Sequence, residues 1–272
     1  MTEDRIKDAF KNAALANGSG PFPEDPGYER MARLVEALAP IALRCGEEST
    51  DAILSAITRI AGNDRRAALI LLEECPDIIA KLLGAGDETL LNVFDIVHQM
   101  IPFGASLAVR FVEVSPALIA ENDFETLTQT AALACSVAQV NVRTAISLVG
   151  ESPAIIERIG FEGLRKVAAL AATIAQSSWA HSIKVVEESP ALLDRMLDAG
   201  SDRQSSLSVY HLASVMARDD WNIAADFVAK IPAILENPAH RIDKPLLDRL
   251  FTRTEKASFF GARPAYTFLE TA

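Results

Sequence analysis

The stretch SPAIIERIG, from Ser152 to Gly160, decides how this sequence is interpreted, because close variants of it occur four more times. The variants are CPDIIAKLL from Cys75, SPALIAEN from Ser115, SPALLDRML from Ser189 and IPAILEN from Ile231. Together with Pro40, their prolines stand 36 to 42 residues apart, at positions 40, 76, 116, 153, 190 and 232. Helical solenoid repeats are about 33 to 47 residues long, so this spacing predicts a chain of helical repeats.

Three further columns of residues repeat in register with the last five prolines. Favoured N-cap residues stand twelve positions before each proline, small residues eight before, and bulky apolar pairs four and five before. The columns are Asp64, Gly104, Asn141, Ser178 and Asp220; Ala68, Ala108, Ala145, Ser182 and Ala224; and Leu71-Leu72, Phe111-Val112, Leu148-Val149, Val185-Val186 and Phe227-Val228. Spacings of three and four residues place the small and bulky columns on one helical face, which predicts the buried face of each repeat.

We expect each serine–proline pair to end one helix and to begin a short third helix. Proline clashes and loses a hydrogen bond inside a helix, whereas at the first helical position after a serine N-cap it is well tolerated. One repeat then has helices at Glu125 to Ala138, Val142 to Glu151 and Pro153 to Ile159. The alternative is one long helix that bends at the proline.

The sequence therefore predicts an all-α fold. It is a right-handed α-solenoid of about six repeats, each with two long helices and a short Ser-Pro-capped helix, in a single domain over residues 1–272. Residues 1–49 are expected to form a degenerate N-terminal cap repeat, with a helix from Glu3 to Ala16. Residues 50–239 form the core repeats, and residues 240–272 a closing helix and an aromatic tail. Terminal repeats are atypical in solenoids because one of their sides faces water.

Charge, cysteine content and hydropathy argue against nucleic acid and membrane as partners and indicate a reducing compartment. The net charge is −11, whereas nucleic-acid binding relies on clustered Lys and Arg. Cys45, Cys75 and Cys135 are odd in number and far apart, as expected of reduced core residues in the cytoplasm. The N-terminus lacks the features of a secretory signal, and no apolar run is long enough to cross a bilayer. We expect a cytoplasmic protein that binds neither nucleic acid nor membrane.

Two of the repeated phrases carry a resemblance to known repeat proteins. A three-helix unit of about 40 residues resembles the armadillo and HEAT class of α-solenoids. The two phrases are SIKVVEESPALLDRM from Ser182 and AISLVGESPAIIERIGFEGLRKVAALAATIA from Ala145. They also look like the helical repeats found ahead of the von Willebrand A domain in bacterial proteins related to nitric-oxide-reductase activators, over roughly Thr50 to Ala239. The resemblance implies an adaptor or scaffold beside a complex of a von Willebrand A protein and an AAA+ ATPase. The chain lacks the DxSxS motif of that domain, so no metal-dependent adhesion is implied.

No arrangement of residues indicates catalysis or cofactor binding. The histidines, His98, His181, His211 and His240, form no HExxH motif and no pair at metal-ligand spacing. The segments GAGDET and NGSG match neither GxGxxG nor GxxxxGK[ST], and the sequence from Gly150 to Ser152 lacks the second half of GxSxG. We assign no catalytic, metal or cofactor-binding residue and expect a protein that is not an enzyme.

An acidic row is the first candidate contact. Acidic residues precede the prolines at Glu73-Glu74, Glu113, Glu151 and Glu187-Glu188, and we select Glu74, Glu113, Glu151 and Glu188 as contacts for a basic protein surface. Equivalent positions in a solenoid stack at about 10 Å, where like charges are not fully screened at physiological salt. The alternative is a solvated face, on which Arg110 pairs with Glu113, and Lys184 pairs with its acidic neighbours.

A tryptophan pair is the second candidate contact. Trp179 and Trp221 both stand eleven residues before a proline, at the expected starts of adjacent second helices, which predicts neighbours on one edge. Aromatic anchors are frequent hot spots at interfaces, whereas the alternative is packing at the seam between repeats.

These candidates predict a scaffold that binds protein partners. The alternative is a solenoid that binds a small ligand or catalyses a reaction in its groove, as in DNA-glycosylase-like HEAT proteins, and the missing catalytic residues count against it. A third hypothesis is self-association through the aromatic tail, Phe259 to Ala272.

Overall fold

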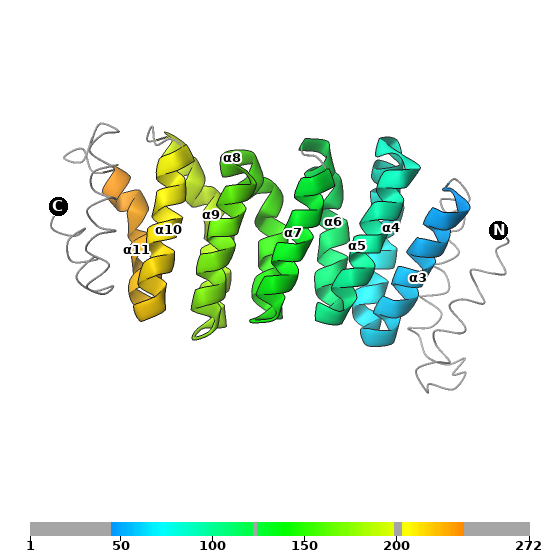
Figure 1. The fold of residues 1–272 in the computed structure, drawn as a ribbon, viewed down its shortest axis with the longest axis horizontal. Coiled ribbons are helices and arrows are strands. Elements are labelled where there is room, and N and C mark those ends of the chain that lie inside the picture. The colour runs from blue at the N-terminus through cyan, green and yellow to red at the C-terminus, as the bar shows by residue number, and fades with distance from the viewer. Residues whose placement is uncertain (1–44, 122–123, 199–202, 237–272) are drawn as a thin grey trace. The chain divides into compact units, whose positions relative to one another are not determined.

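The computed structural model describes residues 45–121, 124–198 and 203–236, and every regular element in these ranges is a helix (Figure 1). The expected all-α class is therefore confirmed. The chain divides into two units, Met1–Ala131 and Ala132–Ala272, each compact by itself. The expected N-terminal cap repeat up to residue 44, His240 and the closing helix and aromatic tail lie outside the described residues.

The first unit packs its helices in two layers. Its elements are α3 (Glu47–Asn63), α4 (Arg65–Ala85), α5 (Asp87–Met100), a 3-10 turn (Ile101–Phe103) and α6 (Ala105–Glu121). Helix α3 lies against α5 and α4 lies against α6, so alternate helices share a layer (Figure 1). Asp87 ties the starts of α3 and α5 together, because its carboxylate accepts from the Gly46 N–H at 3.1 Å and its carbonyl from the Ser49 hydroxyl at 3.3 Å.

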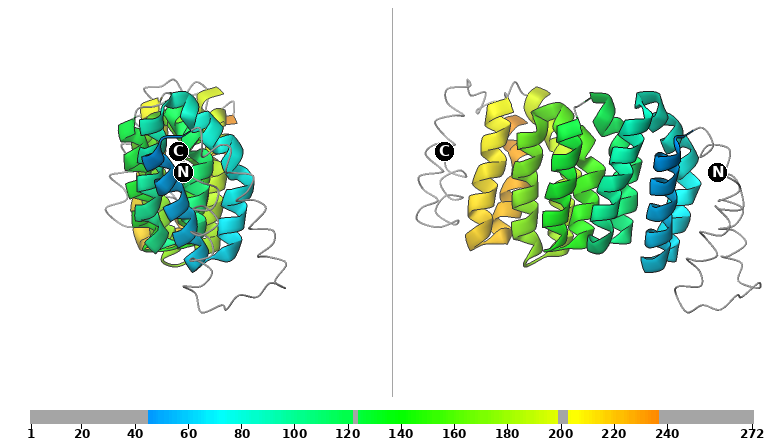
Figure 2. Two further views of the ribbon diagram at one scale, coloured as in Figure 1. Left: turned by 90° about the vertical axis from the view of Figure 1, so that its right-hand side faces the viewer. Right: turned by 45° about the vertical axis from the view of Figure 1, so that its right-hand side comes forward.

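The second unit repeats this arrangement of layers. Helix α7 (Phe124–Ala138) runs across residue 131 and is followed by α8 (Val142–Ala175), α9 (Trp179–Asp198), α10 (Arg203–Asp219) and α11 (Trp221–Glu236). Helix α8 lies against both α9 and α10, and α11 lies against the same two helices (Figure 2). Each interior helix thus buries apolar residues on two sides.

The expected cap column is confirmed, because each of its members directly precedes a helix. Asp64, Gly104, Asn141, Ser178 and Asp220 are followed by helices that begin at positions 65, 105, 142, 179 and 221. The Asp64 carboxylate accepts from the N–H groups of Arg66 at 2.9 Å and Ala67 at 3.1 Å, and Asn141 Oδ1 accepts from the Thr144 N–H at 3.0 Å. These bonds satisfy backbone donors that have no partner within the helix.

The expected buried face is confirmed as well. All five members of the small column are fully buried, and so are Phe111 and Val186 of the bulky column. Ser182 is the polar member of the small column, and its hydroxyl donates to the Ala171 carbonyl of α8 at 2.7 Å. A hydrogen bond of that length between two helices requires close backbones, which explains why the column holds only small residues.

The expectation that each serine–proline pair ends a helix is wrong. Pro116, Pro153 and Pro190 lie inside α6, α8 and α9. The ranges of α4 and α11 likewise include positions 76 and 232. The helix continues past the proline in these elements, as in the alternative, but the bend of α8 lies at Gly160 and not at Pro153.

The helix continues because the serine replaces the donor that proline lacks. Pro153 has no N–H to offer to the Val149 carbonyl four residues earlier, and the Ser152 hydroxyl donates to that carbonyl at 2.8 Å. Ser115 donates in the same way to the carbonyl of Val112, at 2.8 Å, which Pro116 would leave unpaired. These serines are fully buried, and an unpaired buried carbonyl costs about 1–3 kcal/mol. The hydroxyl removes most of that cost.

The serine of α9 uses a different carbonyl. Ser189 donates to the carbonyl of Val185, at 2.6 Å, rather than to that of Val186. Ser189 also lies beside Tyr210 of α10, which is fully buried. Burial raises the pKa of the Tyr210 hydroxyl, and Ser189 opposes that shift in part. The Tyr210 hydroxyl is buried without a hydrogen-bond partner, because the Ser189 hydroxyl donates to its own backbone.

Helix α8 bends at Gly160, after the proline. The dihedral angles of Gly160, φ 70° and ψ −179°, occur essentially only in glycine. The bend frees the Ile159 carbonyl, which accepts from Nε of Arg203, the first residue of α10, at 2.6 Å. The guanidinium covers Gly160 so closely that a Cβ at this position would overlap it. Gly160 and Arg203 therefore fix where the first part of α8 ends.

Replacing Ser152 by Ala is expected to lower the free energy of unfolding by about 1–3 kcal/mol, because the Val149 carbonyl would stay buried without a donor. Urea denaturation measures the change. Ser208→Ala is the matched control, because the Ser208 hydroxyl donates to the Gln204 carbonyl at 3.0 Å in an exposed part of α10 without a proline. Equal losses in the two variants would contradict the assigned role of Ser152.

Gly160→Ala is expected to lower the free energy of unfolding by at least about 1–3 kcal/mol, because alanine is strained at these dihedral angles and would also displace Arg203. Gly84→Ala serves as the control. Gly84 lies exposed in α4 with open space around it, so alanine should be neutral or should stabilise by up to about 1 kcal/mol. A Gly160→Ala variant with unchanged thermal and urea unfolding would refute the strain assigned to the bend.

Candidate interaction surface

The tryptophans lie at one end of contacting helices in the second unit. Trp179 is the first residue of α9 and Trp221 the first residue of α11. The Trp179 side chain is 48% exposed, and the Arg143 guanidinium of α8 lies over its ring, 4.9 Å from the centroid. Val142, which occupies the register position of the tryptophans in α8, is 37% exposed. We call Val142, Arg143, Trp179, His181 and Trp221 the tryptophan edge.

His181, on the same helix as Trp179, contacts Trp221. Its ring lies against that of Trp221, with centroids 4.8 Å apart and an angle of 52° between the planes. Its Nδ1 is 2.8 Å from the hydroxyl of Ser178, the residue before α9, so the N-cap position orients the imidazole. Each tryptophan is thus covered on one side by a nitrogen-rich side chain from a neighbouring helix.

The acidic candidates lie in different surroundings. Glu113 belongs to the first unit, whereas Glu151 on α8 and Glu188 on α9 belong to the second. Glu151 is half-buried and Glu188 is exposed. The side chain of Glu74 lies outside the described residues. In the second unit, the acidic residues therefore share the helices that carry Arg143 and Trp179.

Local ion pairs reduce the field of these carboxylates. Arg110 Nη1 is 2.8 Å from Glu113 Oε2, and Lys184 Nζ is 3.7 Å from Glu188 Oε1. The residues of each pair stand three or four positions apart on one helix, so their side chains are neighbours on the helix surface, as expected for a solvated face. The Arg110–Glu113 pair is partly buried, since the Glu113 side chain is 23% exposed, whereas the side chains of Lys184 and Glu188 are 64% and 58% exposed. An exposed pair such as Lys184–Glu188 contributes little to stability.

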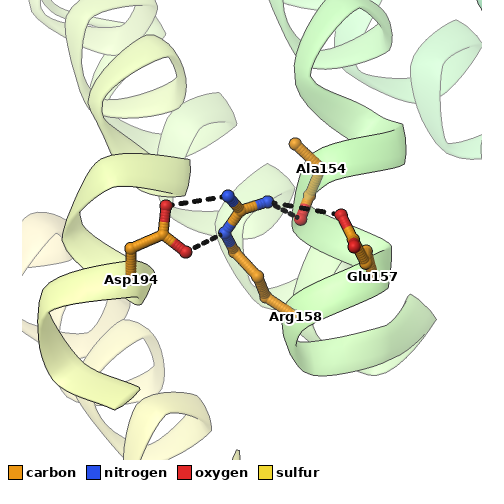
Figure 3. A network of polar contacts seen from close by, with 4 residues as sticks. All are labelled: Ala154, Glu157, Arg158 and Asp194. Atoms are coloured by element: carbon orange, nitrogen blue, oxygen red, sulfur yellow. Dashed lines mark hydrogen bonds and ion pairs between the residues drawn. The ribbon is translucent and has the colours of Figure 1, made fainter. Parts of the chain in front are cut away.

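Arg158 and Asp194 form a bidentate ion pair between α8 and α9 (Figure 3). The distances are 2.5 Å from Nε to Oδ1 and 2.7 Å from Nη2 to Oδ2, and Nη1 donates to the Ala154 carbonyl at 2.8 Å. Glu157 Oε2 lies 3.7 Å from the same guanidinium. The hydrogen bond raises the pKa of Arg158 and lowers the pKa of Asp194. Sequence analysis missed this pair, although the residues stand one repeat apart.

Three contacts hold the first part of α8 beside α9 in a fixed register. They are Arg143 with Trp179, the Ser147 hydroxyl with Glu187 Oε1 at 2.8 Å, and Arg158 with Asp194. The residues of each pair are separated by 36 or 40 positions, and they occur in the same order on both helices. The two helices therefore run parallel, which brings their N-terminal ends to the same edge.

His98 and Cys135 are partly buried. His98 of α5 pairs through Nε2 with the Ser55 hydroxyl of α3 at 3.0 Å, and its Nδ1 is buried without a hydrogen-bond partner. Burial and Arg59 lower the pKa of His98. Burial also raises the pKa of Cys135. Within residues 45–121, 124–198 and 203–236, no group of His, Cys, Asp and Glu side chains could hold a metal ion.

Comparisons with family models, with curated proteins and with solved structures find no match for this chain. In the described part of the chain, no helix combines the length and apolar character that crossing a membrane requires. The described part of the chain is all-α. At the N-terminal ends of α8 and α9, Val142 and Trp179 are exposed, whereas Trp221 at the start of α11 is half-buried.

Proposed function

We propose that this protein is a non-catalytic scaffold or adaptor that binds protein partners through the tryptophan edge. The observation that carries the proposal is the exposed ring of Trp179, held in place by Arg143. Tryptophan and arginine are the residues most enriched among interface hot spots. A large aromatic surface that is already fixed loses little conformational entropy on binding.

The proposal includes a right-handed solenoid of the HEAT and armadillo kind. Its support is the 36–42-residue register of caps, small residues and prolines, together with the two-layer packing inside each unit. Such folds present long surfaces built from equivalent positions of successive repeats. In this protein, the equivalent positions Val142, Trp179 and Trp221 supply the apolar part of the surface.

The acidic residues on α8 and α9 add an electrostatic component to the proposed surface. Glu151 and Glu188 lie on the helices that carry Arg143 and Trp179. With a net charge of −11, the chain attracts basic partners over distance, and this steering weakens as salt rises. We place the scaffold in the cytoplasm, beside an assembly of the von Willebrand A and AAA+ ATPase type, as the resemblance of the repeats implies.

Quantitative affinity capture from the native cell lysate tests the proposal. A double variant with Trp179→Ala and Trp221→Ala is expected to lower the recovery of one set of proteins by about tenfold or more. Truncation of a hot-spot residue costs about 2 kcal/mol or more of binding free energy. Glu151→Lys with Glu188→Lys should remove the salt-sensitive part of the capture. Leu197→Ala, which truncates a 37%-exposed apolar side chain elsewhere on α9, should change nothing.

Thermal unfolding of each variant shows that loss of capture does not reflect loss of fold. Equal recovery of the same proteins by the wild type and the double tryptophan variant would contradict the proposed role of the edge.

A further inference from the structure

We infer that the tryptophan edge selects a linear protein segment in which a carboxylate side chain stands next to an apolar one. Arg143 would bind the carboxylate, and the exposed surfaces of Trp179 and Val142 would cover the apolar side chain. This inference rests on the proposed function and specifies the chemistry of the partner at Arg143 alone. The basic surface of the partner proposed above would lie opposite Glu151 and Glu188.

Arg143 differs from the other basic side chains of α8. Arg158 pairs with Asp194, whereas Arg165 and Lys166 both pair with Glu162. Arg143 is exposed, and none of the carboxylates in the described ranges lies within ion-pair distance of it. An acidic chain that pairs its other α8 cations thus leaves this one accessible beside Trp179, the most exposed large apolar side chain among the described residues.

The contact with Trp179 leaves the N–H donors of Arg143 available to a carboxylate. The guanidinium lies over the indole of Trp179, with Cζ 4.9 Å from the ring centroid. The N–H donors of a guanidinium lie in its own plane. A carboxylate binds in that plane and accepts two parallel hydrogen bonds, so stacking and ion pairing do not compete. Because the indole also limits the rotation of the side chain, less entropy is lost when the ion pair forms.

The apolar half of the site lies next to Arg143. Val142 and Val140 are 37% and 41% exposed and flank the N-cap of α8. Asp220, the residue before Trp221, is the N-cap of α11, where its carboxylate accepts from the Asn222 N–H at 2.9 Å. A basic segment would meet the charge of Arg143, and a neutral one would leave its donors to water. A segment with an acidic and an apolar side chain is complementary to both Arg143 and the exposed apolar side chains.

Selection of random linear peptides on the full chain tests the inference. Peptides that bind the wild type but not Trp179→Ala are expected to carry Asp or Glu next to Leu, Ile, Val or an aromatic residue. Both tryptophans of the chain lie on this edge, so intrinsic fluorescence reports binding there directly. Changing the peptide's Asp to Asn, or its Glu to Gln, should weaken binding to the wild type by about tenfold.

Matched variants separate the charge of Arg143 from its other effects. Arg143→Gln should bind the acidic peptide and its amide counterpart equally, whereas Arg165→Gln, a charge removal elsewhere on α8, should discriminate like the wild type. Selected peptides that need Trp179 but show no preference for a carboxylate would overturn the inference and leave the scaffold proposal intact. A selection that yields no Trp179-dependent peptide would count against both.

Discussion

A buried serine hydroxyl that donates to the carbonyl freed by the following proline is the interaction on which these helices depend. In α6 and α8 it pairs a backbone carbonyl that would otherwise be buried in the hydrophobic core without a hydrogen bond, which is costly. The helix then continues past the proline and buries Ile155, Ile156 and Ile159 in the same face as the preceding turns. Proline also restricts the unfolded chain, which favours the folded state once its carbonyl partner is supplied.

The length of these helices sets the position of the candidate surface. Because α8 passes Pro153, Arg158 reaches Asp194, and Arg143 reaches Trp179 at the other end of the same two helices. The Gly160 bend and the Arg203 hydrogen bond end this segment at Ile159. Contacts at both ends hold α8 and α9 in parallel register, so residues at equivalent repeat positions meet at one edge.

Periodic features of this fold could be predicted from the sequence, whereas single contacts between helices could not. The helix class, the cap column and the fully buried small column follow from residue type and spacing, and the structure confirms each. The expected end of the helix at Ser152 is wrong. A serine hydroxyl can accept from a later N–H as an N-cap, or it can donate to an earlier carbonyl. Ser152 donates to the carbonyl of Val149. The pairing of Arg143 with Trp179 depends on which helices become neighbours, and no local pattern specifies that choice.

Residue-resolved hydrogen exchange after Pro153 tests the continuous helix most directly. In a continuous helix, the amides of Ala154, Ile155 and Ile156 donate to carbonyls of the preceding turn. They should therefore be protected as strongly as the amides of Leu148 and Val149. In a helix that starts at Pro153, the amides of Ala154 and Ile155 would have no helical acceptor, whereas Ile156 would still donate to the carbonyl of the N-cap residue Ser152. Rapid exchange of Ala154 and Ile155, beside protected neighbours on either side, would contradict the account.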